Sequence, residues 1–238
     1  MIERALSVTP PEVRGLRPKD LAGYGRVYLG SEFCRNLLPS ADDVRALKDK
    51  GAAELTVLTP LLPAAPLKAF LKTFDRILRV FPGAELSLSD LGLMRAVNRA
   101  YGKSVPLLLG RPVSVDFVRM DEKFLERFFA ENNLRRLEID DPDRAASFGG
   151  GAIKLSFHYP FRYLAMTKFC PFKKKGVCSR SCAGRTVKIR QTPPYSGDFF
   201  LRNNSYFAEN RAAPPKGIGR TVFPLSAGAR LFRARAGA

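Results

Sequence analysis

Residues 27–59 read VYLGSEFCRNLLPSADDVRALKDKGAAELTVLT, and this stretch decides the fold. Two short apolar runs, Val27–Gly30 and Leu55–Thr59, flank a segment with helical spacing, Ala41–Lys50, which begins after Ser40 and ends before a glycine. Serine is a favoured helix N-cap and glycine a favoured stop, so the stretch is predicted as strand, helix, strand. The unit indicates a parallel pair of strands, because parallel strands need a crossover connection.

The same alternation continues along the chain. Further strands are predicted at Glu85–Ser89, Pro106–Leu109, Arg136–Ile139 and Ile153–Tyr159, and further helices at Pro66–Phe81, Leu91–Ala100 and Glu122–Glu131. Six strands that alternate with helices predict an α/β, TIM-barrel-like parallel fold, complete or incomplete. An open doubly wound sheet is the alternative.

The chain has 238 residues, which suits one domain of barrel size. We expect an N-terminal extension over residues 1–24, a single barrel-like domain over residues 25–230 and a loose tail over residues 231–238. Within the domain, residues 160–215 contain much Gly, Pro, Lys and Arg. They are predicted to form an irregular basic cap that contains the late cysteines, with Asp198–Arg202 as one late strand.

The net charge of +18 is unevenly distributed. Residues 1–143 hold 22 basic and 20 acidic side chains, whereas residues 144–238 hold 18 basic side chains and only Asp198 and Glu209. Like charges repel one another in a compact state, so such a block indicates an anionic partner or ligand, with RNA as one candidate.

The amino-terminal segment MIERALSVTPPEVRGLRPKD contains no apolar stretch of signal-peptide length. The most apolar region, Leu55 to Leu71, is interrupted by three prolines and Lys68, so no membrane span is expected. We therefore expect a cytoplasmic protein, in which cysteines are metal ligands or catalytic thiols more often than disulfides.

Four cysteines form the strongest chemical pattern. Cys170, Cys178 and Cys182 are spaced C-x7-C-x3-C, and Cys34 lies 136 positions before the first of them. Cys34 and Cys170 each follow a predicted strand, so both are expected at the carboxyl end of the sheet. Four thiolates suit zinc or a [4Fe–4S] cluster, and the absence of a C-x2-C knuckle from the sequence favours the cluster. Zinc, and cysteines that bind no metal, are the alternatives.

Basic residues surround the late cysteines. They are Lys168, Lys173, Lys174, Lys175, Arg180 and Arg185. Their charge would offset that of a thiolate-bound cluster, but a cluster has too little negative charge to balance the whole excess. These residues are therefore candidates for binding an anion.

The other site candidates follow predicted strands, where a barrel places functional groups. His158 is the only histidine and a candidate for proton transfer, with a structural role as the alternative. Glu32 and Asp90 are candidate catalytic carboxylates, although Asp90 also suits a helix cap. Asp140 and Asp141 are further candidates, although the following proline also suits a turn. No G-x-S-x-G or H-E-x-x-H motif occurs, which disfavours a hydrolase of those kinds.

Five segments resemble the collagenase-like peptidase U32 family, and within it the UbiU- and UbiV-like proteins. They are VYLGSEFC, LSLSDLGLMRAVN, LLLGRP, HYPFRYLAMTKFCPF and GVCSRSC, and the resemblance covers about residues 25–210. It implies a TIM-barrel-like fold and a [4Fe–4S] cluster bound by Cys34, Cys170, Cys178 and Cys182. It also implies a part in oxygen-independent hydroxylation of a ubiquinone precursor or of RNA bases, beside a second UbiU/UbiV-like subunit.

Three functions stay open from the sequence. The first is an enzyme, or a subunit of one, for oxygen-independent hydroxylation. The second is an RNA-binding or RNA-modifying protein in which a metal orders the basic cap. The third is a peptidase, which rests on the family name alone.

Overall fold

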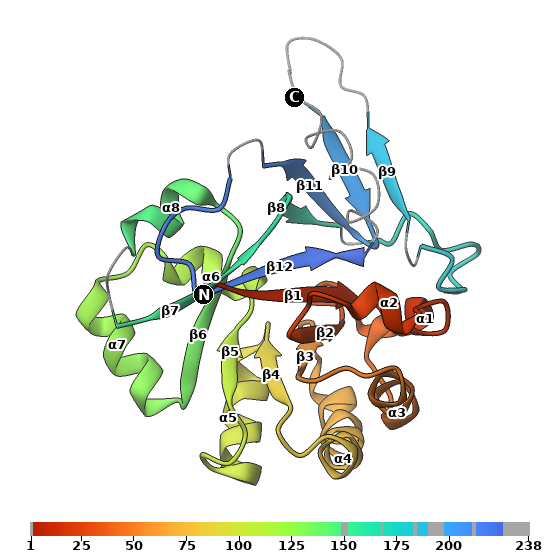
Figure 1. Ribbon diagram of the computed structural model, residues 1–238, viewed down its shortest axis with the longest axis horizontal. Helices are drawn as coiled ribbons and strands as arrows, with labels where there is room; N and C mark the ends of the chain where they lie inside the picture. The colour runs from red at the N-terminus through yellow and green to blue at the C-terminus, as the bar shows by residue number, and fades with distance from the viewer. Residues whose placement is uncertain are drawn as a thin grey trace.

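Eight parallel strands close into a barrel in the order β1-β12-β7-β6-β5-β4-β3-β2 (Figure 1). The structure is a computed structural model and describes residues 2–148, 152–167, 169–182, 185–189, 198–210 and 213–225. The barrel confirms the predicted α/β, TIM-barrel-like fold in its complete form, and the doubly wound alternative is wrong.

The barrel strands are β1 (Glu3–Val8), β2 (Arg26–Gly30), β3 (Leu55–Thr59), β4 (Glu85–Leu88), β5 (Leu107–Leu109), β6 (Leu134–Ile139), β7 (Lys154–His158) and β12 (Arg220–Pro224). The helices are α1 (Pro10–Val13), α2 (Pro18–Leu21), α3 (Ala41–Asp49), α4 (Ala64–Val80), α5 (Leu91–Tyr101), α6 (Arg111–Phe117), α7 (Glu122–Glu131) and α8 (Pro142–Ser147), with a 3-10 turn at Arg35–Leu37. A second, antiparallel sheet contains β8 (Phe161–Met166), β9 (Thr186–Ile189), β10 (Phe199–Arg202) and β11 (Ser205–Glu209).

The six predicted strands are β2 to β7, and two further strands close the barrel. Strand β1 pairs with both β2 and β12, so the segment expected as an N-terminal extension contains a barrel strand. Strand β12 pairs with β7 on its other side. Both strands carry charged residues that point into the barrel, Glu3 and Arg220, and these obscured the apolar pattern by which a buried parallel strand is recognised.

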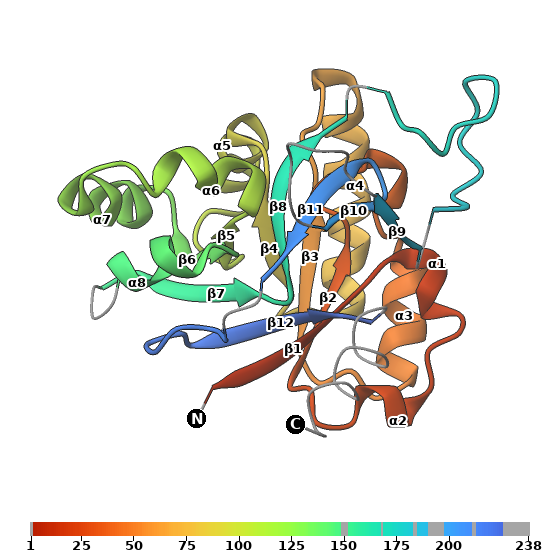
Figure 2. The same ribbon diagram turned by 90° about the horizontal axis from the view of Figure 1, so that it is seen from above.

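The segment between β7 and β12 is more regular than predicted. It contains the four-stranded sheet in the order β8-β11-β10-β9, where we expected an irregular cap with one strand at Asp198–Arg202. Strand β10 is that late strand, and the other three were missed. The sheet lies above the barrel strands in Figure 1 and in front of them in Figure 2, which is seen from above. The expected tail over residues 231–238 lies outside the described residues.

Apolar side chains fill the layer between the barrel and its helices, and polar side chains fill much of the barrel itself. The outer layer contains Phe74 and Ile77 of α4, which are fully buried against the strands. Helix α3 begins as predicted at Ser40, whose hydroxyl accepts the backbone N–H of Asp43. Among the described residues, no helix is both long and apolar enough to cross a membrane.

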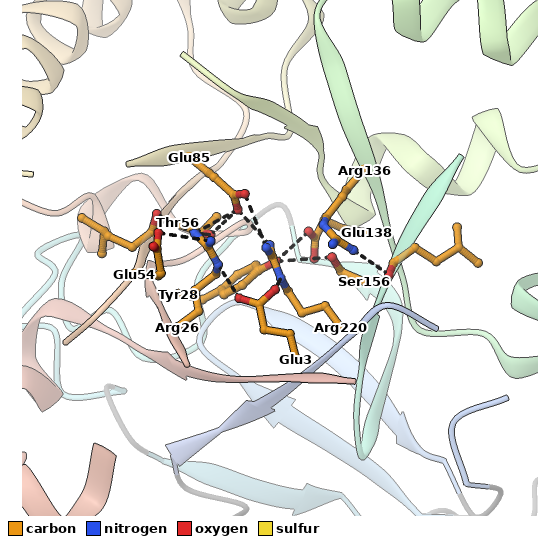
Figure 3. Close-up of polar contacts among 12 residues, drawn as sticks. Glu3, Arg26, Tyr28, Glu54, Thr56, Glu85, Arg136, Glu138, Ser156 and Arg220 are labelled. Carbon is orange, nitrogen blue, oxygen red and sulfur yellow. Dashed lines mark hydrogen bonds and ion pairs between the residues drawn. The ribbon is translucent and has the colours of Figure 1, made fainter. Parts of the chain in front are cut away.

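The amino-terminal half of the barrel interior contains a buried ion network (Figure 3). Arg220 Nε lies 2.7 Å from Glu3 Oε2, and Arg220 Nη1 lies 2.8 Å from Glu85 Oε2. Arg26 binds the same two glutamates, at 2.8 and 3.2 Å. Burial by itself raises the pKa of Glu85, but the hydrogen bond and charge of Arg220 and the charge of Arg26 outweigh it, so the pKa is lowered overall.

We expect Arg220→Ala to lower the free energy of unfolding by about 3–5 kcal/mol, because it leaves two largely buried glutamates with one cation fewer. Urea unfolding followed by circular dichroism measures this change. Arg45→Ala is the control, since Arg45 pairs with Asp42 on the surface of α3. It should cost less than about 0.5 kcal/mol. Equal stability of the two variants would contradict a supporting role for the network.

Candidate functional site at the barrel mouth

A cavity of about 60 Å³ lies at the carboxyl ends of the barrel strands, where barrels of this kind build their sites. Its lining comes from the ends of β1, β2, β3, β7 and β12 and from the antiparallel sheet that covers them. The polar side chains in that lining are Ser7, Thr9, Glu12, Ser31, Glu32, Arg111, His158, Tyr159, Arg202 and Asn203. Two of the predicted site residues, Glu32 and His158, therefore lie at one cavity.

Arg111 joins three loops at this mouth. Its Nε and Nη2 lie 2.8 and 2.5 Å from Glu32 Oε2, and its backbone N–H donates to Glu32 Oε1 at 2.9 Å. Its Nη1 lies 3.2 Å from Asp140 Oδ2, which also accepts the backbone N–H of Tyr163 in β8 at 2.8 Å. Both oxygens of Glu32 are thus engaged, so Glu32 acts here as an anchor of its loop.

The loop that carries Cys34 leaves β2 through a turn that requires glycine. Gly30 has φ of 121°, and a Cβ atom there would lie 2.7 Å from the carbonyl oxygen of Leu58. Phe33 then stacks on Tyr163 with ring centroids 4.8 Å apart and meets Phe207 edge to face. The ion pair of Glu32 and the aromatic contacts of Phe33 hold two successive residues of the loop in place. Cys34 is the next residue.

The four cysteine thiols lie near enough for their charges to act on one another, although Cys34 is distant from the others in sequence. Cys182 is buried and the other three are half-buried, and none forms a disulfide. Burial, together with the charges of Cys34, Cys170 and Cys178, raises the pKa of Cys182 to about 11. Burial also raises the pKa of Cys34, and backbone hydrogen bonding from Asn36 and Leu37 opposes that shift.

The donor set fits a thiolate-bound metal centre in its chemistry. Mutual repulsion makes four neighbouring thiolates unfavourable without a cation, and a bound cation reverses that effect. In the part of the chain that the structure describes, no three His, Cys, Asp or Glu side chains are arranged to hold an ion as they stand. The sulfurs would therefore have to draw together, and three of them lie on the largely exposed segment 169–182.

The basic residues near the late cysteines face solvent. Lys173, Lys174, Lys175, Arg180 and Arg185 are all exposed, and no ion pair joins them to a described carboxylate. Lys175 and Gly176 have positive φ and turn the chain between Lys174 and Val177, which form a β-bridge. Lys168 lies outside the described residues.

His158 contacts a carboxylate that the sequence analysis missed. Its Nε2 lies 2.5 Å from Glu138 Oε2, and both side chains are buried. Glu138 lies inside β6, and its only sequence signal is that Arg136 and Glu138 alternate with apolar residues in a strand. Polar residues two apart in such a strand indicate one polar face, here the barrel interior.

The remaining predicted carboxylates have structural partners. Asp90 caps α5 by accepting the N–H of Leu93 at 2.9 Å, and its other oxygen accepts the N–H of Leu62 at 2.9 Å. Asp141 caps α8. Asp140 and Asp141 also line a second cavity of about 500 Å³, which is bounded by α6, α8 and β8.

Fold and site together define a class of protein, an eight-stranded β/α barrel whose mouth is covered by an antiparallel sheet. The chain is similar to the solved structure of the U32 peptidase Mk0906, with a TM-score of 0.51 and 10% identity over 94% of this chain and 92% of that chain. At that identity the similarity shows a shared fold. No family model matches this sequence, and the search of curated proteins finds no match.

We expect Arg111→Ala to destabilise the protein by about 3–5 kcal/mol, because Glu32 and Asp140 then lose a buried cation. Urea unfolding followed by circular dichroism measures this change. Arg162→Ala is the control, since Arg162 is 42% exposed and pairs with Asp141 at the edge of the site. An Arg111→Ala protein with wild-type stability would show that the anchor is dispensable.

Proposed function

We propose that Cys34, Cys170, Cys178 and Cys182 bind a [4Fe–4S] cluster beside the barrel mouth. The observation that carries the proposal is that four thiols from two distant segments of the chain lie near enough for their charges to act on one another. Four cysteines are the usual ligand set of such a cluster. The wide spacing favours the cluster over zinc, whose structural sites use closer pairs of cysteines. The N–H groups of Asn36 and Leu37 would tune the cluster through the Cys34 sulfur.

We further propose that the protein takes part in oxygen-independent hydroxylation of a ubiquinone precursor or a related substrate. The support is the resemblance of the cysteine-bearing segments to UbiU- and UbiV-like proteins, together with a polar cavity in the usual position of a barrel site. When bound, the cluster would supply electron transfer. The chain's own residues at the cavity would bind and orient the substrate. A second UbiU/UbiV-like subunit is the expected partner.

A peptidase function has less support from the geometry. Among the described residues that line the cavity of His158 there is no cysteine, so His158 has no thiol nucleophile to activate there. The geometry of this cavity therefore gives no support to a cysteine peptidase, and the name of the similar structure is not carried over to this chain.

We expect Cys34→Ala to remove iron as completely as Cys178→Ala, because loss of any one thiolate disrupts a four-ligand site. Iron and sulfide assays and the visible absorption spectrum after anaerobic purification measure the effect. Ser179→Ala, an exposed change next to Cys178, is the control and should keep its iron. Full iron retention by Cys34→Ala would exclude it as a ligand, and stoichiometric zinc in a colourless protein would favour the zinc alternative.

A second candidate function is RNA binding by the basic segment. It is favoured by the exposed cations Lys173, Lys174 and Lys175 at the tip of the turn beside the cysteines, with which no described carboxylate pairs. Phe169, which is 79% exposed, adds an aromatic surface on the same segment. Cations combined with exposed aromatic rings are typical of surfaces that bind single-stranded nucleic acid.

If RNA binds there through about five phosphate contacts, the slope of log affinity against log salt should be about −3.5. Replacing the three lysines with alanine should flatten that slope by about two units, since each single-strand contact contributes about 0.7. Fluorescence anisotropy with a single-stranded RNA at several salt concentrations measures it. The control replaces three other exposed lysines, Lys68, Lys72 and Lys123, on α4 and α7. Equal slopes for the two triple variants would contradict this candidate.

A further inference from the structure

The barrel interior contains a carboxyl–histidine pair that the cluster proposal does not use. His158 lines the cavity at the end of β7, and its Nε2 is 2.5 Å from Oε2 of the fully buried Glu138 in β6. Because Nε2 is engaged by Glu138, Nδ1 is the ring nitrogen that can serve a molecule in the cavity.

Two further strands hold the pair in place. Tyr28 Oη of β2 donates to the other carboxyl oxygen of Glu138 at 2.9 Å, and Arg220 Nη1 of β12 donates to the same Oη at 2.8 Å (Figure 3). The Tyr28 ring also meets the His158 ring edge to face, with centroids 5.8 Å apart. Contacts from four barrel strands therefore leave the pair little freedom to reorient.

The surroundings place an exchangeable proton on this pair near neutral pH. Burial raises the pKa of Glu138 to about 7, whereas burial and the charges of Arg111 and Arg220 lower the pKa of His158 to about 3. Interacting groups titrate as a unit, so the pair gains one proton near pH 7 and keeps the imidazole uncharged. The charged or titratable groups that act on the pair are Tyr28, Glu32, Glu85, Arg111, Arg136 and Arg220.

We propose that His158 is the proton acceptor of the barrel-mouth cavity, and that Glu138 positions His158 and receives the proton from it. The proposal rests on the proposed hydroxylation. The step acts on a ring carbon that already bears the new oxygen and is still bonded to hydrogen, as in a cyclohexadienone. Its C–H bond breaks, and the electron pair restores the aromatic ring and leaves the negative charge on a phenolate oxygen. The proton passes to His158 Nδ1, and the Nε2 proton passes to Glu138 Oε2. This proton-loss step needs no oxidant or reductant, and no imidazolium forms beside the two arginines.

The cavity sets a limit on what reaches His158. Its volume of about 60 Å³ admits a small polar group or the reacting edge of a ring. The remainder of a larger substrate would lie outside it. His158 is therefore the catalytic residue in this proposal, and Glu138 and Tyr28 are positioning residues.

The single histidine makes the first test direct. In protein labelled with ¹⁵N-histidine, the ring nitrogen signals of the wild type should shift with a midpoint near pH 7 and show no imidazolium above pH 5. Tyr28→Phe should raise the midpoint by about one pH unit, because the carboxylate loses a hydrogen-bond donor. Glu138→Gln should abolish the inflection. An ordinary histidine titration in the wild type, or an unchanged curve in Glu138→Gln, would overturn the proposal.

The second test uses the iron-loaded protein with its partner subunit and a ubiquinone precursor. Wild-type kcat should fall about tenfold per pH unit below the midpoint, since only the deprotonated pair accepts a proton. Glu138→Gln should lower kcat at least about 100-fold with unchanged iron and absorption spectrum, and Tyr28→Phe should shift the pH profile as it shifts the NMR midpoint. Ser87→Ala, a buried change elsewhere in the barrel, is the control and should keep both.

The outcomes separate the two proposals. Full activity in Glu138→Gln would overturn the proton-acceptor role and leave the hydroxylation proposal intact. A wild type that holds iron but hydroxylates no precursor would overturn the hydroxylation and, with it, this use of the pair. If Glu138→Gln fails to fold, a pH profile of Tyr28→Phe that coincides with the wild type would overturn the role of the pair.

Discussion

The ion pairs of Arg111 determine how the mouth of this barrel is arranged. A guanidinium buried between Glu32 and Asp140 has one favourable geometry, because any displacement leaves a charge without a partner away from water. Asp140 passes this constraint to the covering sheet through the backbone of Tyr163. The loop after β2, the start of α6 and the antiparallel sheet are thus held in one arrangement, and the position of Cys34 follows from it.

The distribution of charge follows from the same principle of pairing. Inside the barrel, Arg26 and Arg220 are matched by Glu3 and Glu85, so the strands can be buried although their inner faces are charged. On the segment with the late cysteines, the cations face solvent and no described carboxylate pairs with them. The interior charges therefore serve the fold, whereas the exposed charges are available to a ligand or partner.

Glu138 belongs neither to the paired interior charges nor to the exposed charges. Burial raises the pKa of Glu138 to about 7. Each of its two carboxyl oxygens nevertheless has a hydrogen-bond partner, Tyr28 on one and His158 on the other. Burying an ionisable carboxyl in a core costs folding free energy, even when both of its oxygens are hydrogen-bonded. Carboxyls whose pKa is shifted in this way are concentrated at functional sites. The polar interior of the barrel reduces this cost, because the neighbouring arginines offset the charge of Glu138 when it ionises.

The sequence by itself determined the parallel β/α fold, strands β2 to β7 and the cap of α3, because these depend on apolar periodicity and on residues close in the chain. It also pointed to His158 and Glu32, since both end or follow recognisable strands. Only the tertiary structure showed that β1 and β12 close the barrel, that Arg111 binds a glutamate 79 positions away, and that Glu138 supports His158. These features depend on which strands become neighbours and in what register they pair. The local sequence pattern does not specify the pairing or the register. That the four thiols meet in one site was predicted from the strand context and stays a prediction. The structure shows that the charges of Cys34, Cys170 and Cys178 act on Cys182, which depends on how the folded loops approach one another.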